Sequence, residues 1–266
     1  MPEYNINTLG NTIVTTFPTQ VSNRTFLITG PSQGSVGAET ALTLAHGSPS
    51  TLILLGRDLS KIQPVITSIS TINPSINIKY IPIDLSSFAS VRSAAKSILD
   101  DTSIPKIDIM INNAAVMAAP YKVTEDGFES HFQINHLSHF LLTNLLMPKL
   151  LLPSSSSDDD DSQSARILNI SSSAHQISDI RYGDIDFGAG KEYVPWLAYG
   201  QSKTANLLFT VELNRRFKGK GCGVWSFAPT PGAVDSGLQR YVTKEMREQG
   251  ERAWKEAGKE LPVRKR

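Results

Sequence analysis

Near the start of this 266-residue chain, a short β-prone run leads into a glycine-rich turn and then into a helical pattern. We expect a strand over residues 24–29, a turn that contains Gly30, Gly34 and Gly37, and a helix over 38–46. A helix N-terminus offers free backbone amides to an anion, and glycine allows the anion to approach the backbone closely. The flanking strand and helix favour a nucleotide phosphate site over the alternative, a glycine-rich loop that binds nothing.

The alternation of strand and helix continues along the chain. Further strands are expected at 51–55, 77–83, 106–111, 166–170 and 223–228. Helical patterns lie between them at 59–70, 88–99, 125–152 and 196–217, and a charged helical pattern follows at 238–257. Strands that alternate with helices form a parallel sheet covered on both faces, and ligands bind at the carboxyl ends of the strands where the strand order reverses. The predicted fold class is therefore α/β, with a doubly wound parallel sheet of six strands.

One domain accounts for most of the chain. With 40% apolar and 19% charged residues, the chain has enough apolar material for one large core. We assign residues 1–22 to an irregular lead-in with a short edge strand, and residues 23–238 to the main domain. Residues 154–164 contain four Ser followed by four Asp and are expected to form a low-complexity surface loop inside that domain. Residues 239–266 are expected to form a charged C-terminal helix and tail.

Charge and composition argue against several classes of partner. The 26 basic and 25 acidic residues are dispersed, which argues against nucleic acid or an anionic membrane as the main partner. The most apolar stretch, 140–152, is too short to span a bilayer, and the first twenty residues lack a secretory pattern. The single Cys222 cannot form an internal disulfide, so we expect a soluble protein of the reducing cytoplasm. His131, His136 and His139 lack acidic or cysteine partners at metal-ligand spacing; we expect them to be packing or surface residues and expect no metal site.

The end of the second predicted strand bears on the choice of cofactor. In dinucleotide-binding folds the residue at this tip faces the adenosine ribose, where an acid accepts from the 2′-hydroxyl and an arginine pairs with a 2′-phosphate. Here Arg57 and Asp58 follow the strand. Arg57 favours NADP over NAD, and the alternative for Arg57 is a cation on a solvated loop. Asp84, after the third strand, is either a contact to the adenine amino group or an acid of the turn.

Tyr199 and Lys203 stand four residues apart in the helical pattern 196–217, so their side chains leave the same face of the helix. A nearby ammonium favours the phenolate, and such a pair can exchange a proton with an alcohol or a carbonyl near neutral pH. A Tyr and a Lys at this spacing also arise by chance, so the pair gains meaning only beside a cofactor site. Asn135, in an otherwise apolar run, is either a core amide with satisfied hydrogen bonds or part of a polar relay.

Taken in order, these motifs resemble the short-chain dehydrogenase/reductase family, whose sheet is of the Rossmann type, and within it the branch of retinol dehydrogenase-like and WW-domain oxidoreductase-like proteins. The resemblance covers about residues 24–238. Each motif is common by itself, whereas the whole series in the family's order is specific. The resemblance rests on Thr29-Gly30, Gly34, Gly37, Asn112-Asn113-Ala114, Asn135, Ser171-Ser172, Tyr199 and Lys203.

The resemblance implies roles for the residues that match. Tyr199 would be the general acid and base on the substrate oxygen, and Ser172 would hydrogen-bond and orient that oxygen. Lys203 would hold the nicotinamide ribose and lower the pKa of Tyr199, and Asn135 would anchor a water that links Lys203 to solvent. The hydride itself belongs to the nicotinamide. The implied cofactor contacts are Gly30, Ser32, Gly34, Val36, Gly37, Arg57, Asp84, Leu85, Asn113, Ala114, Tyr199, Lys203, Pro231, Gly232, Val234 and Ser236.

The chain departs from the family pattern in three places. Ser35 and Val36 separate Gly34 from Gly37, where the family has one residue, so the turn is one residue longer. Ala115 stands where the family usually has Gly. The family ordinarily continues to a seventh strand and a substrate-covering segment, and neither is visible in the sequence that follows the sixth strand.

Two functions remain as hypotheses. The leading one is an NADP-dependent oxidoreductase that interconverts an alcohol and a carbonyl on an apolar small molecule. The alternative is a non-catalytic or defective dinucleotide-binding remnant that lacks the C-terminal substrate segment. A nucleotide-sugar epimerase also uses a Tyr and Lys pair, but it would need a larger C-terminal substrate domain. The largely apolar helix from Tyr199 to Phe217 is expected to be covered by the sheet and by a second subunit in a homodimer.

Overall fold

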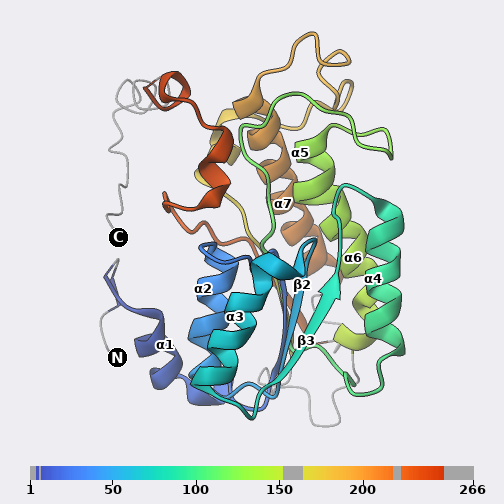
Figure 1. Cartoon of the computed structure of the whole chain (residues 1–266). Helices are drawn as coiled ribbons and strands as arrows, with labels where there is room; N and C mark the ends of the chain where they lie inside the picture. Colours follow the sequence, from blue (N-terminus) through green and yellow to red (C-terminus); the bar gives the residue numbers. More distant parts are fainter. Residues whose placement is uncertain (1–3, 6, 152–163, 218–222, 249–266) are drawn as a thin grey trace.

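The computed structural model describes residues 4, 5, 7–151, 164–217 and 223–248, and within them a six-stranded sheet (Figure 1). Every neighbouring pair of strands is parallel, and the order is β3-β2-β1-β4-β5-β6. The order reverses between β1 and β4, so the predicted doubly wound α/β sheet is confirmed. The strands are β1 (Thr25–Thr29), β2 (Thr51–Gly56), β3 (Asn77–Pro82), β4 (Ile109–Asn112), β5 (Ala165–Asn169) and β6 (Val224–Phe227).

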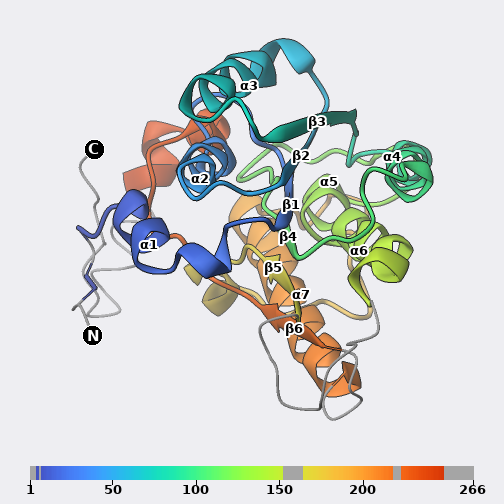
Figure 2. The same ribbon diagram turned by 90° about the horizontal axis from the view of Figure 1, so that it is seen from below.

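Helices cover both faces of the sheet, as the view along it in Figure 2 shows. One layer holds α1 (Gly10–Thr16), α2 (Val36–Ala45) and α3 (Leu59–Ile72). The opposite layer holds α4 (Phe88–Asp100), α5 (Ser130–Phe132), α6 (Ser138–Leu150) and α7 (Pro195–Phe217), with a π-helical turn η2 (Gln133–Leu137) between α5 and α6. Short 3-10 turns complete the set: η1 (Pro18–Gln20), η4 (Ser173–Ile177) and η5 (Gly237–Tyr241).

The apolar core lies on both faces of the sheet. Along β1, Leu27 packs in the cluster formed with α4, α6 and α7, whereas Phe26 and Ile28 pack with α2 and α3. All five residues of β1 and all six of β2 are buried. Strands that are buried on two sides consist of nearly continuous apolar residues, which is why these runs were identifiable in the sequence.

Side chains that follow the strands cap the next helices. Ser35 accepts a hydrogen bond from the Ala38 amide at the start of α2, and Asp58 accepts one from the Ser60 amide at the start of α3. Ser87 caps α4 by accepting from the Ser90 amide. A cap satisfies an amide that has no partner inside the helix and is typically worth about 1 kcal/mol.

The largest difference from the predicted elements lies before α5. The expected helix over 125–152 begins only at Ser130, because Val123 and Glu129 form an isolated antiparallel bridge and Gly127 adopts a φ of +86° that closes a turn. Glu129 then caps the late start: its carboxylate accepts from the amides of His131 and Phe132, both at 2.9 Å. The sequence pattern does not reveal this competition between turn and helix.

Both ends of the chain also differ from the prediction. The lead-in is not irregular: it contains α1 and η1, and the buried Val14 attaches α1 to the core. The expected helix over 238–257 appears as η5 followed by a helical turn at 244–248. Residues 249–266, most of the low-complexity loop 154–164, and Cys222 lie outside the described residues. None of the helices in the described ranges is both long and apolar enough to cross a membrane.

Candidate functional site

A pocket of about 420 Å³ opens at the carboxyl ends of β1, β2 and β4, where the strand order reverses. This volume is in the range of small-molecule and cofactor sites. Most of the predicted cofactor contacts line it: Gly30, Ser32, Gly34, Val36, Arg57, Asp84, Leu85, Asn113, Ala114, Tyr199, Lys203, Pro231 and Ser236. Gly37, Gly232 and Val234 do not line it.

Close packing explains two of the glycines in the turn. Gly30 has a φ of +69°, and a Cβ there would lie 2.8 Å from the Cβ of Ala114. A Cβ on Gly37 would lie 2.6 Å from the side-chain nitrogen of Asn113, so Gly37 shapes the site from behind rather than lining it. The extra residue in this turn has a role as well: Ser35 caps α2 and donates to the Gly30 carbonyl at 3.1 Å. The turn therefore holds the N-terminus of α2 at the pocket, and phosphate binding there stays a prediction.

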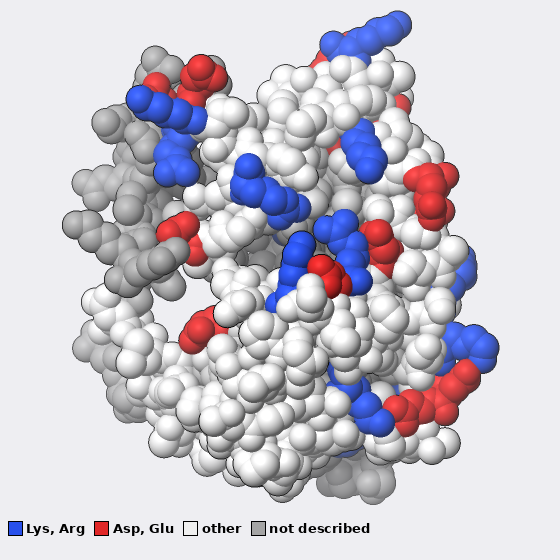
Figure 3. All heavy atoms as spheres, in the orientation of Figure 1, with Lys and Arg blue, Asp and Glu red and all other residues white. Residues whose placement is uncertain are grey.

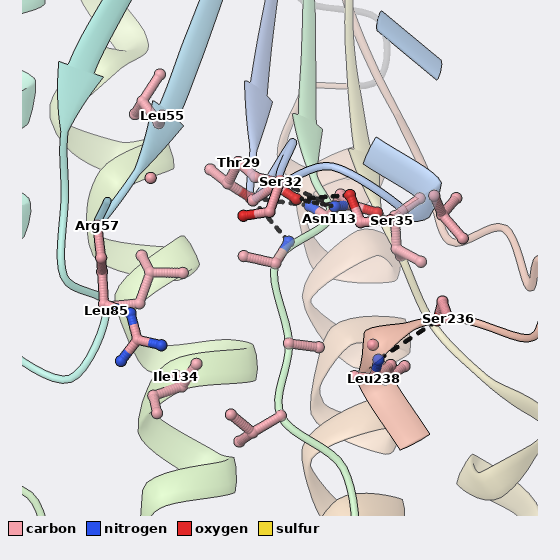
Figure 4. Close-up of a pocket in the computed structure, with 18 of the residues that line it drawn as sticks. Thr29, Ser32, Ser35, Leu55, Arg57, Leu85, Asn113, Ile134, Ser236 and Leu238 are labelled. Atoms are coloured by element: carbon pink, nitrogen blue, oxygen red, sulfur yellow. Dashed lines mark hydrogen bonds between the residues drawn. The ribbon is translucent and has the colours of Figure 1, made fainter. Parts of the chain in front are cut away.

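The structure separates the roles of Arg57 and Asp58. The Asp58 carboxylate accepts from both the amide and the hydroxyl of Ser60, which lowers its pKa and commits it to the start of α3. Arg57 makes no ion pair or hydrogen bond within the described part of the chain, and Figure 4 shows its side chain extending from the end of β2 along the pocket wall past Leu85. Of the two neighbours, Arg57 is the one free to meet a ligand.

Two more cations at the pocket were not predicted from the sequence. Lys61, on the first turn of α3, and Arg240, in η5, line the same pocket as Arg57. Figure 3 shows basic side chains gathered near the centre of this face, over the ends of α2 and α3. Arg57 follows β2, Lys61 lies in α3 and Arg240 lies in η5, so the fold is needed to bring all three together. The i+4 spacing of Arg57 and Lys61 was the one available signal.

Asp84 is engaged as an acid of its own turn. One carboxylate oxygen accepts from the amide and the hydroxyl of Ser86, at 2.9 and 2.7 Å. Its backbone amide donates to the Ser90 hydroxyl, while the residue also lines the pocket beside Leu85. The structure thus gives Asp84 a turn role, and its predicted contact to adenine stays a prediction.

Asn112 and Asn113 have different tasks at the end of β4. The Asn112 side chain donates to Asn169 on β5 at 2.9 Å, which ties these two neighbouring strands together. The Asn113 side chain donates back to the Thr29 carbonyl at 2.9 Å, across to β1. The Thr29 hydroxyl accepts from the amides of Asn113 and Ala114, at 2.9 and 3.0 Å. These contacts fix the floor of the pocket, and Figure 4 shows them beside Ser35.

Of the four predicted catalytic residues, Tyr199 and Lys203 line the pocket, and Ser172 and Asn135 do not. Tyr199 on α7 is only 4% exposed, and the Ser172 side chain, which follows β5, lies close enough to its phenol to lower the pKa of that phenol. Lys203, one turn along α7, is 2% exposed and donates from Nζ to the Ile170 carbonyl at 2.7 Å. The ammonium lies 5.5 Å from the centre of the Tyr199 ring. Tyr199 and Lys203 thus share one face of α7, as their spacing predicted, and Ser172 lies near the phenol; their catalytic roles stay a prediction.

The pKa of Tyr199 corrects one expectation. Burial raises it from 10.0 to about 12, against a smaller lowering by the Ser172 hydrogen bond, and Lys203 is not among the causes. Burial also lowers the pKa of Lys203 from 10.5 to about 7. The predicted lowering of the tyrosine pKa by the lysine is thus reversed, because both groups lose water and the ammonium turns toward a carbonyl.

Asn135 is a fully bonded amide inside the π-helical turn. Its oxygen accepts from the Val116 amide at 2.8 Å, and its nitrogen donates to the Val116 carbonyl and the Ser202 hydroxyl, both at 2.9 Å. The first of its two sequence interpretations, a satisfied core amide, therefore applies. Its place between α7 and the segment after β4 leaves the relay role as a prediction.

The three histidines of this helix are largely buried polar links. His139 lies between Asn135, whose carbonyl is 3.1 Å from Nδ1, and Thr29, whose hydroxyl is 2.9 Å from Nε2. His136 faces Asn206 on α7, and His131 pairs with Glu129, a partner that sequence reasoning missed. Within the described ranges, no group of three metal-ligating side chains occurs.

Acid is expected to destabilise the chain through His139. Burial lowers the pKa of His139 to about 4, so the unfolded chain binds a proton below pH 6.5 while the folded chain stays neutral. The stability is therefore full above pH 6.5 and is lost as the pH falls toward 4, by about 2 kcal/mol between pH 7 and 5. Urea unfolding at both pH values measures the loss, which should shrink in His139→Gln; equal losses in both proteins would contradict the assignment.

Comparisons with known proteins agree with this geometry. The sequence model of the short chain dehydrogenase family matches residues 24–247. Human retinol dehydrogenase 13 is 39% identical over 224 residues, which are 84% of this chain and 62% of that protein. A crystal structure of an uncharacterized Mycobacterium paratuberculosis protein is 35% identical, with a TM-score of 0.66 over 87% of this chain and 76% of that one. The Pseudomonas aeruginosa RhlG/NADP active-site complex is 25% identical, with a TM-score of 0.63 over 88% and 83%. The chain thus spans less than two thirds of the curated relative's length.

Proposed function

Because the chain belongs to the short-chain dehydrogenase family, we propose that it transfers a hydride between NADP and an apolar alcohol or its carbonyl counterpart. The observation that carries the proposal is that the Tyr199 phenol, with the Ser172 side chain near it, lines the same pocket as the glycine-rich turn. Such a pocket suits a long dinucleotide, with its phosphates at the turn and its reactive ring near the phenol.

The residues present fit a dinucleotide. Gly34 lines the pocket with open space where a Cβ would stand, and the start of α2 offers backbone amides to a pyrophosphate. Arg57 would pair with a 2′-phosphate, and Lys203 would reach the nicotinamide ribose. When bound, the nicotinamide would supply or accept the hydride. The RhlG complex with NADP, which shares the fold, supports the same choice of cofactor.

The chain's own groups would handle the proton and the substrate oxygen. The Ser172 hydroxyl would hydrogen-bond the substrate oxygen and hold it beside the Tyr199 phenol. Because burial raises the pKa of Tyr199 to about 12, the phenol carries its proton at neutral pH. This is the form that donates to a carbonyl oxygen during reduction, so we propose carbonyl reduction as the favoured direction near pH 7.

An apolar substrate is supported by the surface near the site and by a relative. Ile177 and Val194 are exposed apolar residues on the segment 173–195, which leads into α7. Retinol dehydrogenase 13 carries an apolar alcohol in its name. We therefore place apolar aldehydes, ketones and alcohols first among the candidate substrates.

The function is tested by NADPH oxidation with purified protein and a panel of apolar aldehydes and ketones. We expect turnover with at least one carbonyl compound and little with NADH. A fluorescence titration with NADPH runs beside it. Tight binding without turnover of any carbonyl would favour the non-catalytic alternative, and no binding of either nucleotide would refute both.

Arg57→Ser is expected to raise the KM for NADPH and leave that for NADH nearly unchanged. A hydrogen-bonded contact to a charged group contributes about 1.5–3 kcal/mol, which corresponds to about 10-fold to 150-fold in KM. Steady-state kinetics with both cofactors measure the ratio. Arg92→Ser, on the exposed part of α4, is the matched control and should change neither value. A parallel rise for NADPH and NADH in Arg57→Ser would contradict the 2′-phosphate role.

A homodimer through α7 stays a proposal. The polar residues Ser202, Asn206 and Thr210 face the chain's own sheet and loops, as their hydrogen bonds show. Leu208 and Val211 on the same helix are 46% and 64% exposed, and this apolar pair supports contact with a second copy. Sedimentation equilibrium of the purified chain measures the assembly state.

A further inference from the structure

His131 is a buried histidine beside the catalytic tyrosine that the proposed mechanism does not use. Its ring is fully buried on α5, and its centre lies 6.3 Å from that of Tyr199, in an edge-on arrangement with 67° between the planes. Glu129, whose side chain is fully buried, lies against Nδ1 at 2.8 Å. A buried ionisable pair next to a reacting group has a structural or a functional reason to be there.

The hydrogen bonds fix which ring nitrogen carries the proton. The Ala119 amide can only donate, and it lies 3.1 Å from Nε2, so Nε2 must accept. The single proton of a neutral ring is then on Nδ1, where it points to the Glu129 carboxylate. The ring is thereby held in one orientation, with Glu129 on one side and the Ala119 backbone on the other.

His131 holds the segment 114–121, whose first residues line the same pocket as Tyr199. His131 binds the Ala119 amide, and the Tyr193 hydroxyl donates to the Ala119 carbonyl at 2.8 Å. The preceding Ala118 has a φ of +51°, a conformation that costs about 1–2 kcal/mol for a residue with a side chain. Both backbone polar groups of Ala119 are thus hydrogen-bonded, next to the strained Ala118. Side chains outside the segment therefore fix its path.

The helical stretch that carries His131 also binds the segment 114–121 at a second residue, Val116. Asn135, four residues after His131, binds both polar backbone groups of Val116, and Val116 lines the pocket. Figure 4 shows the chain after Asn113 running through the pocket between Ile134 and the η5 turn that carries Leu238. His131 and Asn135 thus hold this segment at two residues, Ala119 and Val116.

We propose that His131 is a positioning residue for the substrate side of the site, which holds Ala119 so that the segment 114–121 stands at the distance from Tyr199 that a carbonyl substrate requires. This inference rests on the proposed function for its kinetic consequence. Its structural consequence, the immobilisation of the segment 114–121 by the Nε2 contact, can be measured without turnover.

Two substitutions separate this role from a merely structural one. In His131→Gln, the side-chain oxygen can occupy the place of Nε2 and accept from the Ala119 amide, while the proton to Glu129 is lost. In His131→Asn, the side-chain NH₂ can occupy the place of Nδ1 and donate to Glu129, while the shorter side chain does not reach Ala119. His131→Gln thus keeps the contact to the Ala119 amide, and His131→Asn keeps the donor to the Glu129 carboxylate.

Hydrogen exchange of the peptide 114–122 and steady-state kinetics decide between the positioning role and a merely structural role of His131. For His131→Asn we expect about tenfold faster exchange in this peptide and about tenfold higher KM for the carbonyl substrate, with the NADPH dissociation constant within about twofold of the parent. For His131→Gln we expect exchange and KM within about threefold of the parent, together with a lower melting temperature because Glu129 loses its donor.

Each outcome bears on the inference. If His131→Asn leaves the exchange of this peptide unchanged, or if His131→Gln loses substrate affinity as much as His131→Asn, the positioning role is wrong. If the parent protein reduces no carbonyl compound, the proposed function fails, and the exchange comparison of the two variants still decides whether His131 positions the segment.

Discussion

Tyr199→Phe is expected to lower the turnover number for carbonyl reduction by about 10²–10⁴-fold, the range that a positioned general acid contributes. The phenol is the proton donor in the proposed reaction, and at 4% exposure water has little access to take its place. The ring itself packs against His131 and Trp196, and phenylalanine keeps those contacts. The substitution therefore removes the proton and leaves the fold.

Two controls separate this loss from damage elsewhere. Tyr80→Phe removes a hydroxyl that donates to the Gly56 carbonyl at 3.0 Å, and it should leave the turnover number nearly unchanged. The NADPH dissociation constant of Tyr199→Phe should stay within about threefold of the parent, because the charged contacts to the cofactor lie elsewhere. A Tyr199→Phe protein with the parent's turnover number would show that another group supplies the proton.

The sequence was sufficient for the centre of the sheet because β1, β2 and β4 are buried on two sides. Leu52, Leu54 and their neighbours form continuous apolar runs, and the glycine turn after β1 marks the strand whose end binds the ligand. The closeness of Tyr199 and Lys203 was also predictable from the sequence, because both residues lie on one helix and local geometry fixes their distance.

Contacts between elements that lie far apart in the sequence could not be predicted from the sequence alone. Asp58 and Glu129 are local exceptions: their carboxylates cap α3 and α5 within three residues, and the apolar pattern alone does not decide these roles. The pKa of Tyr199 depends on burial, which only the packed structure determines. Arg240 reaches the pocket from a segment more than 180 positions after Arg57 along the chain.

Gly30→Ala is expected to reduce the free energy of unfolding by about 2–5 kcal/mol and to weaken NADPH binding at least about tenfold. Two costs add at this position. The φ of +69° costs a residue with a side chain about 1–2 kcal/mol. The new methyl group would also lie 2.8 Å from the Ala114 Cβ and 3.0 Å from its Cα, and overpacking of this kind costs about 1–3 kcal/mol.

Gly34→Ala is the matched control, because it shares the first cost and lacks the second. Gly34 has a φ of +75°, yet a Cβ there would meet nothing within 4 Å. The difference between the two variants in urea unfolding therefore measures the close approach of the turn to the end of β4. Ala114 cannot retreat freely, since its amide donates to the Thr29 hydroxyl at 3.0 Å. Relief must then displace the turn, where the phosphates of NADPH would bind, so fluorescence titration should show the larger loss of affinity for Gly30→Ala. Equal effects of the two substitutions would mean that the turn can move away from β4 at no cost.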